Sequence, residues 1–407
     1  MLYYLPLESV KSRYTEQLSQ DWMPKALSIF NSGYKTIDPY PSGDIPLSDD
    51  IEVGVVCDAV SRSRYSMEQV SELIRLVNTG EIDSDSKIFL QDLTTPGIEA
   101  FLYVCSVFEV YPKIYAMCHA NTFDQYDFTH SFSYWMSHSE KALIGWMTKN
   151  GGAIFCASTV HKEAMLKSQV ECNIFVVGLP YSKGAVDKVL NGKFEDRKKR
   201  VAFTSRLDKE KNPLFMVNVA NMFLALHHDW EWVVTSSKKV PTKDLSLQKA
   251  FHDLSKATNG RFSVLSDLTK KEYYSVLSES SIQFNCSDQD YVSWTLLEAV
   301  DAGCIPCYPN FRSFPEVFYS FHTGESFLYY HCDCKSAVDK LSEMVKKPFL
   351  QSRHIVNVCD LGRKYVSYIL SRSPDQLEQY PSNIWSGSNS AFFEVLSDMV
   401  ELRMKCE

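Results

Sequence analysis

The chain has 407 residues, of which 45% are hydrophobic and 23% are charged, and its formal net charge is −8 at pH 7. This length exceeds what one hydrophobic core serves and suits two domains, and the composition is that of a globular enzyme. The negative charge argues against a surface that coats nucleic acid, although a local basic face remains compatible with it. No apolar run approaches the ~20 residues of a membrane span, and the first residues lack the features of a signal peptide, so we expect a cytoplasmic protein.

The first half alternates apolar strands, polar loops and helices. We expect strands at residues 3–7, 51–57, 87–90, 113–118, 153–157 and 173–180. A Ser- and Arg-rich loop at 58–66 is expected to precede a helix at 67–77, and further helices begin at 98 and after a cap at Ser158. This alternation predicts a Rossmann-like domain whose ligands bind at the carboxyl ends of the strands.

Polar side chains gather where two of these strands end. His119 ends one strand, Asp124 and Asp127 follow on the same loop, and Asp92 ends the neighbouring strand. Each of these acids could orient an acceptor hydroxyl or accept its proton, and the sequence does not choose among them. A lone His is also often a structural group. Near the start of the chain, Arg13 stands in a segment without glycine, where its side chain could contact a ligand.

A charged segment at 193–200 leads into a second alternating half. We expect strands at 201–204, 231–235, 262–265, 281–285 and 304–308, with helices from 213, up to about 256, at 270–277 and from 294 to Gly303. A final amphipathic helix is expected at 391–404. The predicted domains are therefore one Rossmann-like domain at 1–180, a second at 181–390, and a helix within 391–407.

The loop and helix after the strand at 281–285 have the features of a sugar-nucleotide site. Asp290 lies on the loop, and Glu298 lies in the second turn of the helix. A helix start offers N–H groups and a positive dipole end to a phosphate, and carboxylates accept hydrogen bonds from sugar and ribose hydroxyls. Together these groups point to a nucleotide-sugar as ligand.

Residues 288–316 resemble the nucleotide-sugar motif of the retaining GT-B glycosyltransferases of the large family 4. The matching positions are Leu297-Glu298-Ala299, Ala302-Gly303, Pro306 and Pro315-Glu316. Asp290 replaces the first Glu of the motif, and Ser293 replaces its second Gly. Residues 204–213 are similar to a second signature of that family, Gly-Arg-Leu-x-x-x-Lys-Asn-Pro, with Ser205 in place of Gly.

This resemblance implies an α/β protein of the GT-B fold, with two Rossmann-like domains facing across a cleft. The domain at 1–180 would be the acceptor domain, the domain at 181–390 would be the nucleotide-sugar domain, and the helix within 391–407 would return to the first domain. It implies a metal-independent hexosyl- or pentosyltransferase that retains the anomeric configuration, takes a nucleoside-diphosphate sugar and needs no cofactor. UDP is the nucleotide we expect because it is the most frequent, and we expect a monomer. The implied donor-binding residues are Ser205, Arg206, Lys211, Ser266, Asp267, Leu268, Asp290, Ser293, Trp294, Thr295 and Glu298.

The resemblance also implies a role for each group. Arg206 and Lys211 would stabilise the leaving diphosphate, which gains negative charge as the glycosidic bond breaks. Glu298 would bind the ribose, Asp290 the transferred sugar and residues 266–268 the base. His119 would face the donor sugar, as relatives often have a His there.

Three further patterns could indicate a metal. Asp288-Gln289-Asp290 spells D-x-D, which binds a divalent ion in the other glycosyltransferase fold, GT-A. We interpret the D-x-D as coincidental, because Arg206 and Lys211 would already neutralise the charge of the diphosphate. Cys304-Ile305-Pro306-Cys307 falls within an expected strand, and His331-Cys332-Asp333-Cys334 lacks a second ligand pair at zinc-finger spacing. We therefore predict no metal, and buried free thiols for most of the twelve cysteines.

The acceptor is suggested by a looser similarity. Residues 6–18 are similar to the starts of glycosyltransferases encoded by tailed phages, some of which glycosylate hydroxymethylcytosine in DNA. Arg62 and Arg64, expected on the loop after the second strand, would then bind DNA phosphates together with Arg13. One alternative is a saccharide or glycolipid acceptor in surface polysaccharide synthesis, although no basic amphipathic helix suits a membrane surface. Another is a non-catalytic nucleotide-sugar-binding protein.

Overall fold

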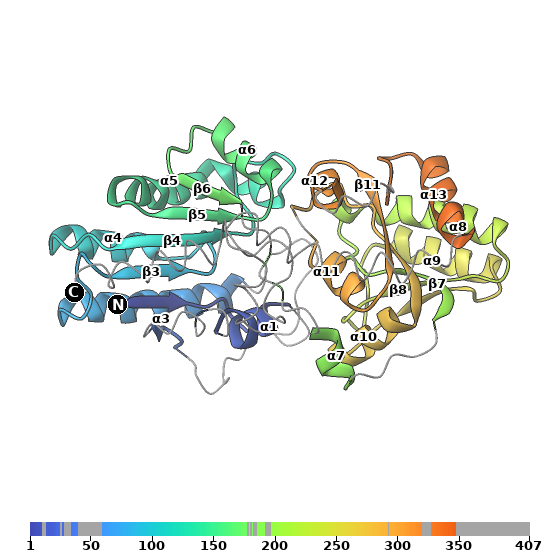
Figure 1. The fold of residues 1–407 in the computed structure, drawn as a ribbon, viewed down its shortest axis with the longest axis horizontal. Coiled ribbons are helices and arrows are strands. Elements are labelled where there is room, and N and C mark those ends of the chain that lie inside the picture. The colour runs from blue at the N-terminus through green and yellow to red at the C-terminus, as the bar shows by residue number, and fades with distance from the viewer. Residues whose placement is uncertain are drawn as a thin grey trace, which may run out of the picture. The chain divides into compact units, whose positions relative to one another are not determined.

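The computed structural model describes residues 1–9, 14–24, 27, 34–39, 59–176, 179, 181, 185–191, 197–291, 293–319 and 327–346. The chain divides into two compact units, with the boundary between Pro180 and Tyr181. Each unit contains a parallel sheet of six described strands with helices beside it (Figure 1). Arg13, the strand expected at 51–57 and the helix expected at 391–404 lie outside the described residues.

The first unit has the strand order β2-β1-β3-β4-β5-β6. Its elements are β1 (Leu2–Leu5), α1 (Tyr14–Gln17), η1 (Leu18–Trp22), β2 (Tyr34–Thr36), α3 (Ala59–Asn78), β3 (Lys87–Leu90), α4 (Ile98–Val107), β4 (Lys113–Cys118), η2 (Phe128–Phe132), α5 (Ser133–Asn150), β5 (Ala153–Cys156), α6 (Thr159–Lys167) and β6 (Asn173–Val176). The predicted strands at 87–90 and 113–118 are confirmed, and so is Ser158 as a cap, because its side chain accepts from the N–H of His161 at the start of α6.

Helix α3 begins eight residues before the predicted start at 67, so the prediction that Arg62 and Arg64 lie on a loop is wrong. The buried position in the first turn of this helix is Arg62, a charged residue. A search for apolar residues at helical spacing therefore finds the helix only from Met67 onward. Strand β2 was not predicted, because none of its residues is buried.

The two faces of the first sheet carry different side chains. One face packs aliphatic residues of the strands against α3, α4 and α5. On the other face an aromatic row crosses the sheet, one ring from each of five strands, with neighbouring ring centroids 5.7–6.4 Å apart. The row consists of Tyr4, Phe89, Tyr115, Phe155 and Phe175. Because successive residues of a strand point to opposite faces, this two-sided burial requires the near-continuous apolar strands that the sequence shows.

The second unit has the strand order β12-β11-β10-β7-β8-β9, and all its strands are parallel. From β7 the chain adds strands first on one side (β8, β9) and then on the other (β10, β11, β12), so the order of the strands reverses between β7 and β10. Its elements are α7 (Ala185–Leu190), β7 (Lys198–Phe203), η3 (Lys209–Lys211), α8 (Pro213–Leu226), β8 (Glu231–Thr235), α9 (Leu245–Ala257), β9 (Phe262–Leu265), α10 (Lys270–Glu279), β10 (Ser280–Phe284), α11 (Trp294–Asp301), β11 (Ile305–Asn310), α12 (Phe314–Tyr319), β12 (Leu328–Tyr330) and α13 (Cys334–Lys346). In open α/β sheets ligands bind at the carboxyl ends of the strands beside such a reversal.

Two local predictions for this unit can be compared with the structure. Residues 198–200, expected in a charged linker, instead open β7, where Lys198 and Arg200 both pair with Glu279 at 2.6 and 3.0 Å. The opposite charges on neighbouring elements explain how a basic run fits into a strand. Gly303 has a φ of +86° directly after α11, which confirms the predicted helix end.

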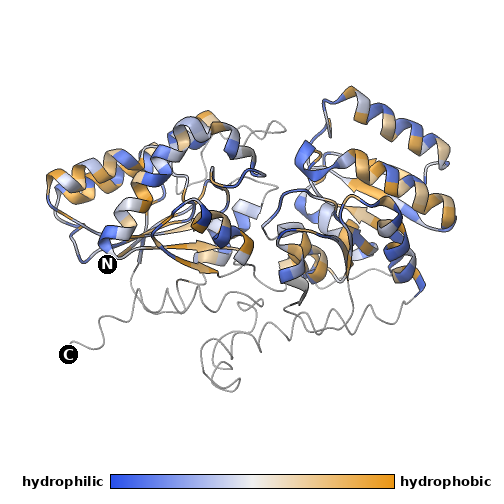
Figure 2. Ribbon diagram, turned by 90° about the horizontal axis from the view of Figure 1, so that it is seen from above, coloured by the Kyte–Doolittle hydropathy of each residue, from blue (hydrophilic) through white to orange (hydrophobic). Residues whose placement is uncertain are grey.

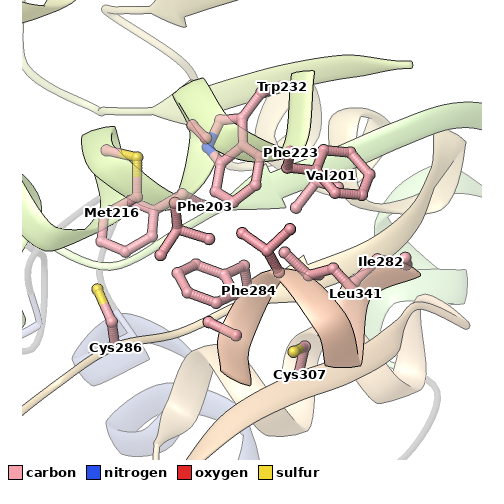
Figure 3. Close-up of a cluster of buried hydrophobic side chains, with 14 of the residues drawn as sticks. Val201, Phe203, Met216, Phe223, Trp232, Ile282, Phe284, Cys286, Cys307 and Leu341 are labelled. Carbon is pink, nitrogen blue, oxygen red and sulfur yellow. The ribbon is translucent and has the colours of Figure 1, made fainter. Parts of the chain in front are cut away.

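The strands of the second unit alternate their side chains between two cores. Val201 and Phe203 of β7 point into the larger core, drawn in part in Figure 3, with Trp232, Phe284 and residues of α8 and α13. Ala202 points to the opposite face, where α7, α10 and α11 pack. Figure 2 shows the same pattern, with largely hydrophobic strands and helices that alternate hydrophobic and hydrophilic residues.

Seven of the described cysteines are buried free thiols, as predicted: Cys105, Cys118, Cys156, Cys172, Cys286, Cys304 and Cys307. The C-x-x-C pair belongs to them, and burial raises the pKa of the Cys304 thiol to about 11. Among the described helices, none combines the length and the hydrophobicity that a bilayer crossing needs.

Candidate functional site

Two loops meet at the carboxyl ends of β7 and β10, where the sheet of the second unit reverses. The amide of Asn285 donates to the Ser205 hydroxyl at 3.1 Å, and the Asp288 N–H donates to the carbonyl of Glu210 at 2.8 Å. Ser205 is buried. The Ser that replaces the expected Gly is thus part of the contact that fixes one loop against the other.

The two predicted cations converge at this edge. Lys211 is buried. Its ammonium donates to the carbonyl of Gln289 at 2.6 Å and lies 3.6 Å from the Asp290 carboxylate. Arg206, with 46% of its side chain exposed, pairs with Asp208 at 2.8 Å. Both cations share Glu210, whose Oε1 lies 2.8 Å from Arg206 and 3.5 Å from Lys211. The structure therefore brings Arg206, Lys211 and Asp290 together, each cation balanced by carboxylates that a diphosphate could replace.

Glu298 lies in a polar cluster inside the second unit. It is 3% exposed, forms an ion pair with Lys270, and accepts hydrogen bonds from the hydroxyls of Tyr273 at 2.9 Å and Tyr274 at 3.0 Å. A carboxylate has about four acceptor positions, so these three partners leave one for a ribose hydroxyl. All three partners belong to the first turns of α10.

In the loop after β9, two backbone N–H groups already have partners. The N–H groups of Asp267 and Leu268 already donate to the carbonyls of Lys238 and Ser236 at 3.1 and 3.2 Å, and Asp267 has a φ of +58°. Ser266 is exposed. A nucleobase at this loop would have to be bound by carbonyl oxygens or side chains rather than by these two N–H groups.

Ser293 occupies the N-cap position of α11 without capping the helix through its side chain. Its hydroxyl pairs with that of Thr295 at 2.8 Å instead. The hydroxyls of Ser293 and Thr295 are therefore directed to each other, so no side chain caps α11 at Ser293, and the carbonyl of Ser293 accepts from the N–H of Leu296 at 3.1 Å. The start of a helix in this condition is suited to a phosphate.

In the first unit, Arg62 holds two acids at the carboxyl ends of the strands. Its guanidinium lies 3.3 Å from Glu8 and 2.5 Å from Asp92, and it donates to the carbonyl of Thr94 at 2.9 Å. Arg62 is 8% exposed. Its position contradicts the expectation of a cation at an exposed rim, whereas Arg64 in the same helix is exposed.

His119 is half-buried beside this group. Its Nε2 lies 2.9 Å from the carbonyl oxygen of Gln91, and burial lowers the pKa of its imidazole, although Asp92 opposes that effect. A carbonyl can only accept, so Nε2 carries the proton in the neutral ring and Nδ1 carries the lone pair. A neutral His119 could thus accept a hydrogen bond from a sugar hydroxyl through Nδ1.

Asp124 and Asp127 have local structural partners. Both are 4% exposed. Asp124 accepts from the N–H of Tyr126 at 3.0 Å, and Asp127 caps η2 by accepting from the N–H and hydroxyl of Thr129 at 2.9 and 2.8 Å. Of the three candidate acids, Asp92 is the one held beside His119.

Sequence reasoning missed Glu210, Lys270, Tyr273, Tyr274 and Glu140. Glu210 could have been found as an acid at helical spacing from Arg206, and the other four gave no signal because their partners are distant in sequence. Glu140 is a buried acid of α5 that accepts from the N–H and hydroxyl of Thr122. Burial raises the pKa of its carboxyl to about 7, and the Thr122 hydrogen bonds oppose this.

Glu140 should make stability depend on pH. Its pKa is about 7 when folded against a usual value of 4.5, so between these values the folded chain holds a proton that the unfolded chain has lost. The contribution of the protonated Glu140 to the free energy of unfolding is fully present below about pH 4.5 and is lost as the pH rises through 7. We expect Glu140→Gln to gain about 2–3 kcal/mol of unfolding free energy over wild type between pH 5 and pH 8, measured by denaturant unfolding. The exposed Glu163, changed to Gln, is the control, and parallel pH profiles for wild type and Glu140→Gln would contradict the prediction.

Comparison with known proteins agrees with the two-domain architecture. No known protein-family profile matches the sequence. The E. coli trehalose-6-phosphate protein bound with UDP-2-fluoro glucose is similar with a TM-score of 0.63 at 11% identity, over 97% of this chain and 98% of that one. Sucrose-phosphate synthase from Thermosynechococcus elongatus is similar with a TM-score of 0.54 at 12% identity, over 93% and 99%.

A third similar structure is a trehalose-6-phosphate synthase studied for glycosyltransfer with retention, with a TM-score of 0.55 at 12% identity, over 83% of this chain and 78% of that one. At such identities the likeness shows the fold and not the substrates. The predicted GT-B class, with two Rossmann-like domains, is thereby confirmed.

Proposed function

We propose that this chain is a retaining glycosyltransferase that takes its sugar from a UDP-sugar. The observation that carries the proposal is the convergence of Arg206 and Lys211 on Glu210, with Asp290 beside Lys211, at the sheet reversal. The shared fold with structures that bind UDP-2-fluoro glucose or are studied for retaining transfer supports the donor and the stereochemistry. The polar cluster around Glu298 supplies a second contact region for a nucleotide.

In the proposed reaction the bond between the anomeric carbon and the diphosphate oxygen breaks, and a bond to the acceptor oxygen forms on the same face. Arg206 and Lys211 stabilise the charge that the departing diphosphate gains. Retention brings the acceptor to the face from which the diphosphate leaves, so a departing phosphate oxygen can take the acceptor proton. Asp92 is a weaker candidate for that role, because its carboxylate is paired with Arg62. Asp290 would accept a hydrogen bond from the sugar.

For the acceptor we keep the two candidates that the sequence raised. Hydroxymethylcytosine in phage DNA would need phosphate-binding cations, and among the described candidates Arg64 remains exposed. The burial of Arg62 against Glu8 and Asp92 favours the second candidate, a saccharide hydroxyl. The similar fold of a structure named sucrose-phosphate synthase is compatible with a sugar acceptor.

A panel experiment separates these acceptors and also a non-catalytic binder. UDP release from UDP-glucose, UDP-N-acetylglucosamine and UDP-xylose would be measured with hydroxymethylated duplex DNA, unmodified DNA and simple glycosides. Stimulation by glycosides alone supports a saccharide acceptor, and stimulation by hydroxymethylated DNA that fades as salt rises supports DNA. If UDP-sugar binds without any turnover, the chain is a binding protein.

Removal of divalent ions should leave the transfer rate within about twofold of the untreated rate, because fixed cations take the place of a metal at the diphosphate. The structure separates the two acids of D-x-D: Asp290 lies near Lys211, and Asp288 near His331. Initial rates with and without chelator test this. Full dependence on added Mn²⁺ or Mg²⁺, with Asp288→Ala and Asp290→Ala both inactive, would contradict the metal-independent mechanism.

A further inference from the structure

Two segments far apart in the sequence bring three metal-ligating side chains together. Asp288 lies on the loop after β10, and His331 and Cys332 lie on the turn after β12. Their ligand atoms all lie within 4.8 Å of one another. The Nε2 of His331 is 3.2 Å from Asp288 Oδ1 and 3.2 Å from Cys332 Sγ. In the described part of the chain, these are the three His, Cys, Asp or Glu side chains whose ligand atoms lie close enough together to hold one metal ion.

The two distances from His331 Nε2, each 3.2 Å, are close to the edges of a tetrahedral metal site. Zinc binds His nitrogen at about 2.0–2.1 Å, carboxylate oxygen at about 2.0–2.2 Å and Cys sulfur at about 2.3 Å. Tetrahedral angles then separate neighbouring ligand atoms by about 3.3–3.7 Å. A thiolate, an imidazole and one carboxylate also form a donor set that suits zinc and not Mg²⁺ or Ca²⁺, which prefer oxygen.

The surroundings hold the three groups in place. The ring of Phe311 stacks on that of His331 with centroids 4.0 Å apart and planes 6° from parallel. The backbone N–H of Asp288 is fixed to the carbonyl of Glu210, and Cys332 has a φ of +57°, an uncommon conformation for a Cys.

We propose that Asp288, His331 and Cys332 form a site for a divalent metal of the zinc class, with three protein ligands and an open fourth position. On binding, the Cys332 thiol loses its proton to solvent, and the proton of His331 resides on Nδ1 while Nε2 takes the metal. Because β11 lies between β10 and β12 in the sheet, the metal fastens two loops that are not neighbours in the sheet.

This metal stabilises the second unit and takes no part in the transfer reaction. Asp290, two residues after Asp288, belongs to the separate group around Lys211. The site therefore does not depend on the proposed function, and the metal-independent rate predicted above is compatible with it.

The test uses the full chain after removal of metals by a chelator. Co²⁺ is added as a spectroscopic stand-in for zinc, because a thiolate bound to Co²⁺ gives a charge-transfer absorption band. We expect one Co²⁺ per chain with this band, displaced by Zn²⁺. Cys332→Ser should abolish the band. His331→Ala should weaken Co²⁺ binding about 100-fold, because removing even a residue that only hydrogen-bonds to a metal ligand lowers metal affinity about 10–100-fold. Zn²⁺ should also raise the Tm of wild type by several degrees and leave that of Cys332→Ser unchanged.

Cys334→Ser is the matched control, because this neighbouring half-exposed cysteine is not part of the group. It should keep both the band and the Zn²⁺-dependent Tm. Unfolding without metal shows whether Cys332→Ser, a change at an exposed side chain, leaves the fold intact. A wild-type chain without the band, or a band that survives Cys332→Ser and is lost in Cys334→Ser, would overturn the proposal.

Discussion

Lys211→Ala is expected to lower kcat about 10²–10³-fold, the cost of losing a fixed group that stabilises charge in the transition state. The side chain of Lys211 is 9% exposed and its ammonium lies between Gln289 and Asp290. A positive charge held this way needs no reorganisation when the diphosphate departs. Steady-state rates with a UDP-sugar and the best acceptor of the panel measure the effect.

Lys209→Ala is the matched control, because Lys209 belongs to the same short helix η3 but is exposed. It should keep kcat within about twofold, as a surface substitution away from the diphosphate does. Arg206→Ala should fall at the lower end of the same range as Lys211→Ala, since nearly half of the Arg206 side chain is exposed. If Lys211→Ala and Arg206→Ala both stay within a few fold of wild type, the diphosphate is bound elsewhere.

Glu298→Ala is expected to cost about 3–5 kcal/mol of unfolding free energy, because it leaves Lys270 without its buried partner. It also removes the acceptor of the Tyr273 and Tyr274 hydroxyls. The prediction is checked by denaturant unfolding of the ligand-free chain, with Lys271→Ala, an exposed neighbour of Lys270, as a control for changes at the surface of α10.

Glu298→Gln separates stability from binding, since it keeps the shape of the side chain and removes its charge. We expect a folded chain whose affinity for UDP falls about 10-fold or more, as when a hydrogen bond to a charged group is lost. Uridine without phosphates should show the same relative loss, because the ribose contact is the one affected. Unchanged affinity for both ligands in Glu298→Gln would place the ribose away from Glu298 and leave this residue a structural role.

Most of the described strands could be predicted from the sequence, because parallel strands buried on both faces are short apolar runs followed by polar loops. The short strands β2 and β12 were not predicted. The predicted starts of α3 and β7 were wrong because charged residues, and not hydrophobic ones, form the contacts at the beginnings of these elements. The first turn of α3 is buried through the ion pairs of Arg62, and β7 opens with a basic run that pairs with Glu279. Such partners come from other elements, so no local pattern indicates them.

For the candidate site, motif spacing predicted which residues lie near one another but not what already binds them. Arg206, Lys211 and Asp290 meet as the resemblance implied. The engagement of Glu298 by α10 and of the N–H groups at 267–268 by the loop after β8 depends on tertiary contacts that a motif does not encode. Likewise, the D-x-D and the His-Cys-Asp-Cys stretch gave no complete metal site when considered separately, and the fold brings one acid of the first to two ligands of the second.

Binding of a nucleotide-sugar at the carboxyl ends of β7 and β10 can be measured by calorimetric titration of the full chain with UDP-sugars. We expect saturable binding of one UDP-sugar per chain, weakened at least about 10-fold in Lys211→Ala, because a charge-assisted contact to the diphosphate is lost. Lys209→Ala should bind as wild type does. Absence of binding for every UDP-sugar in the panel, or equal affinity in wild type and Lys211→Ala, would contradict the account.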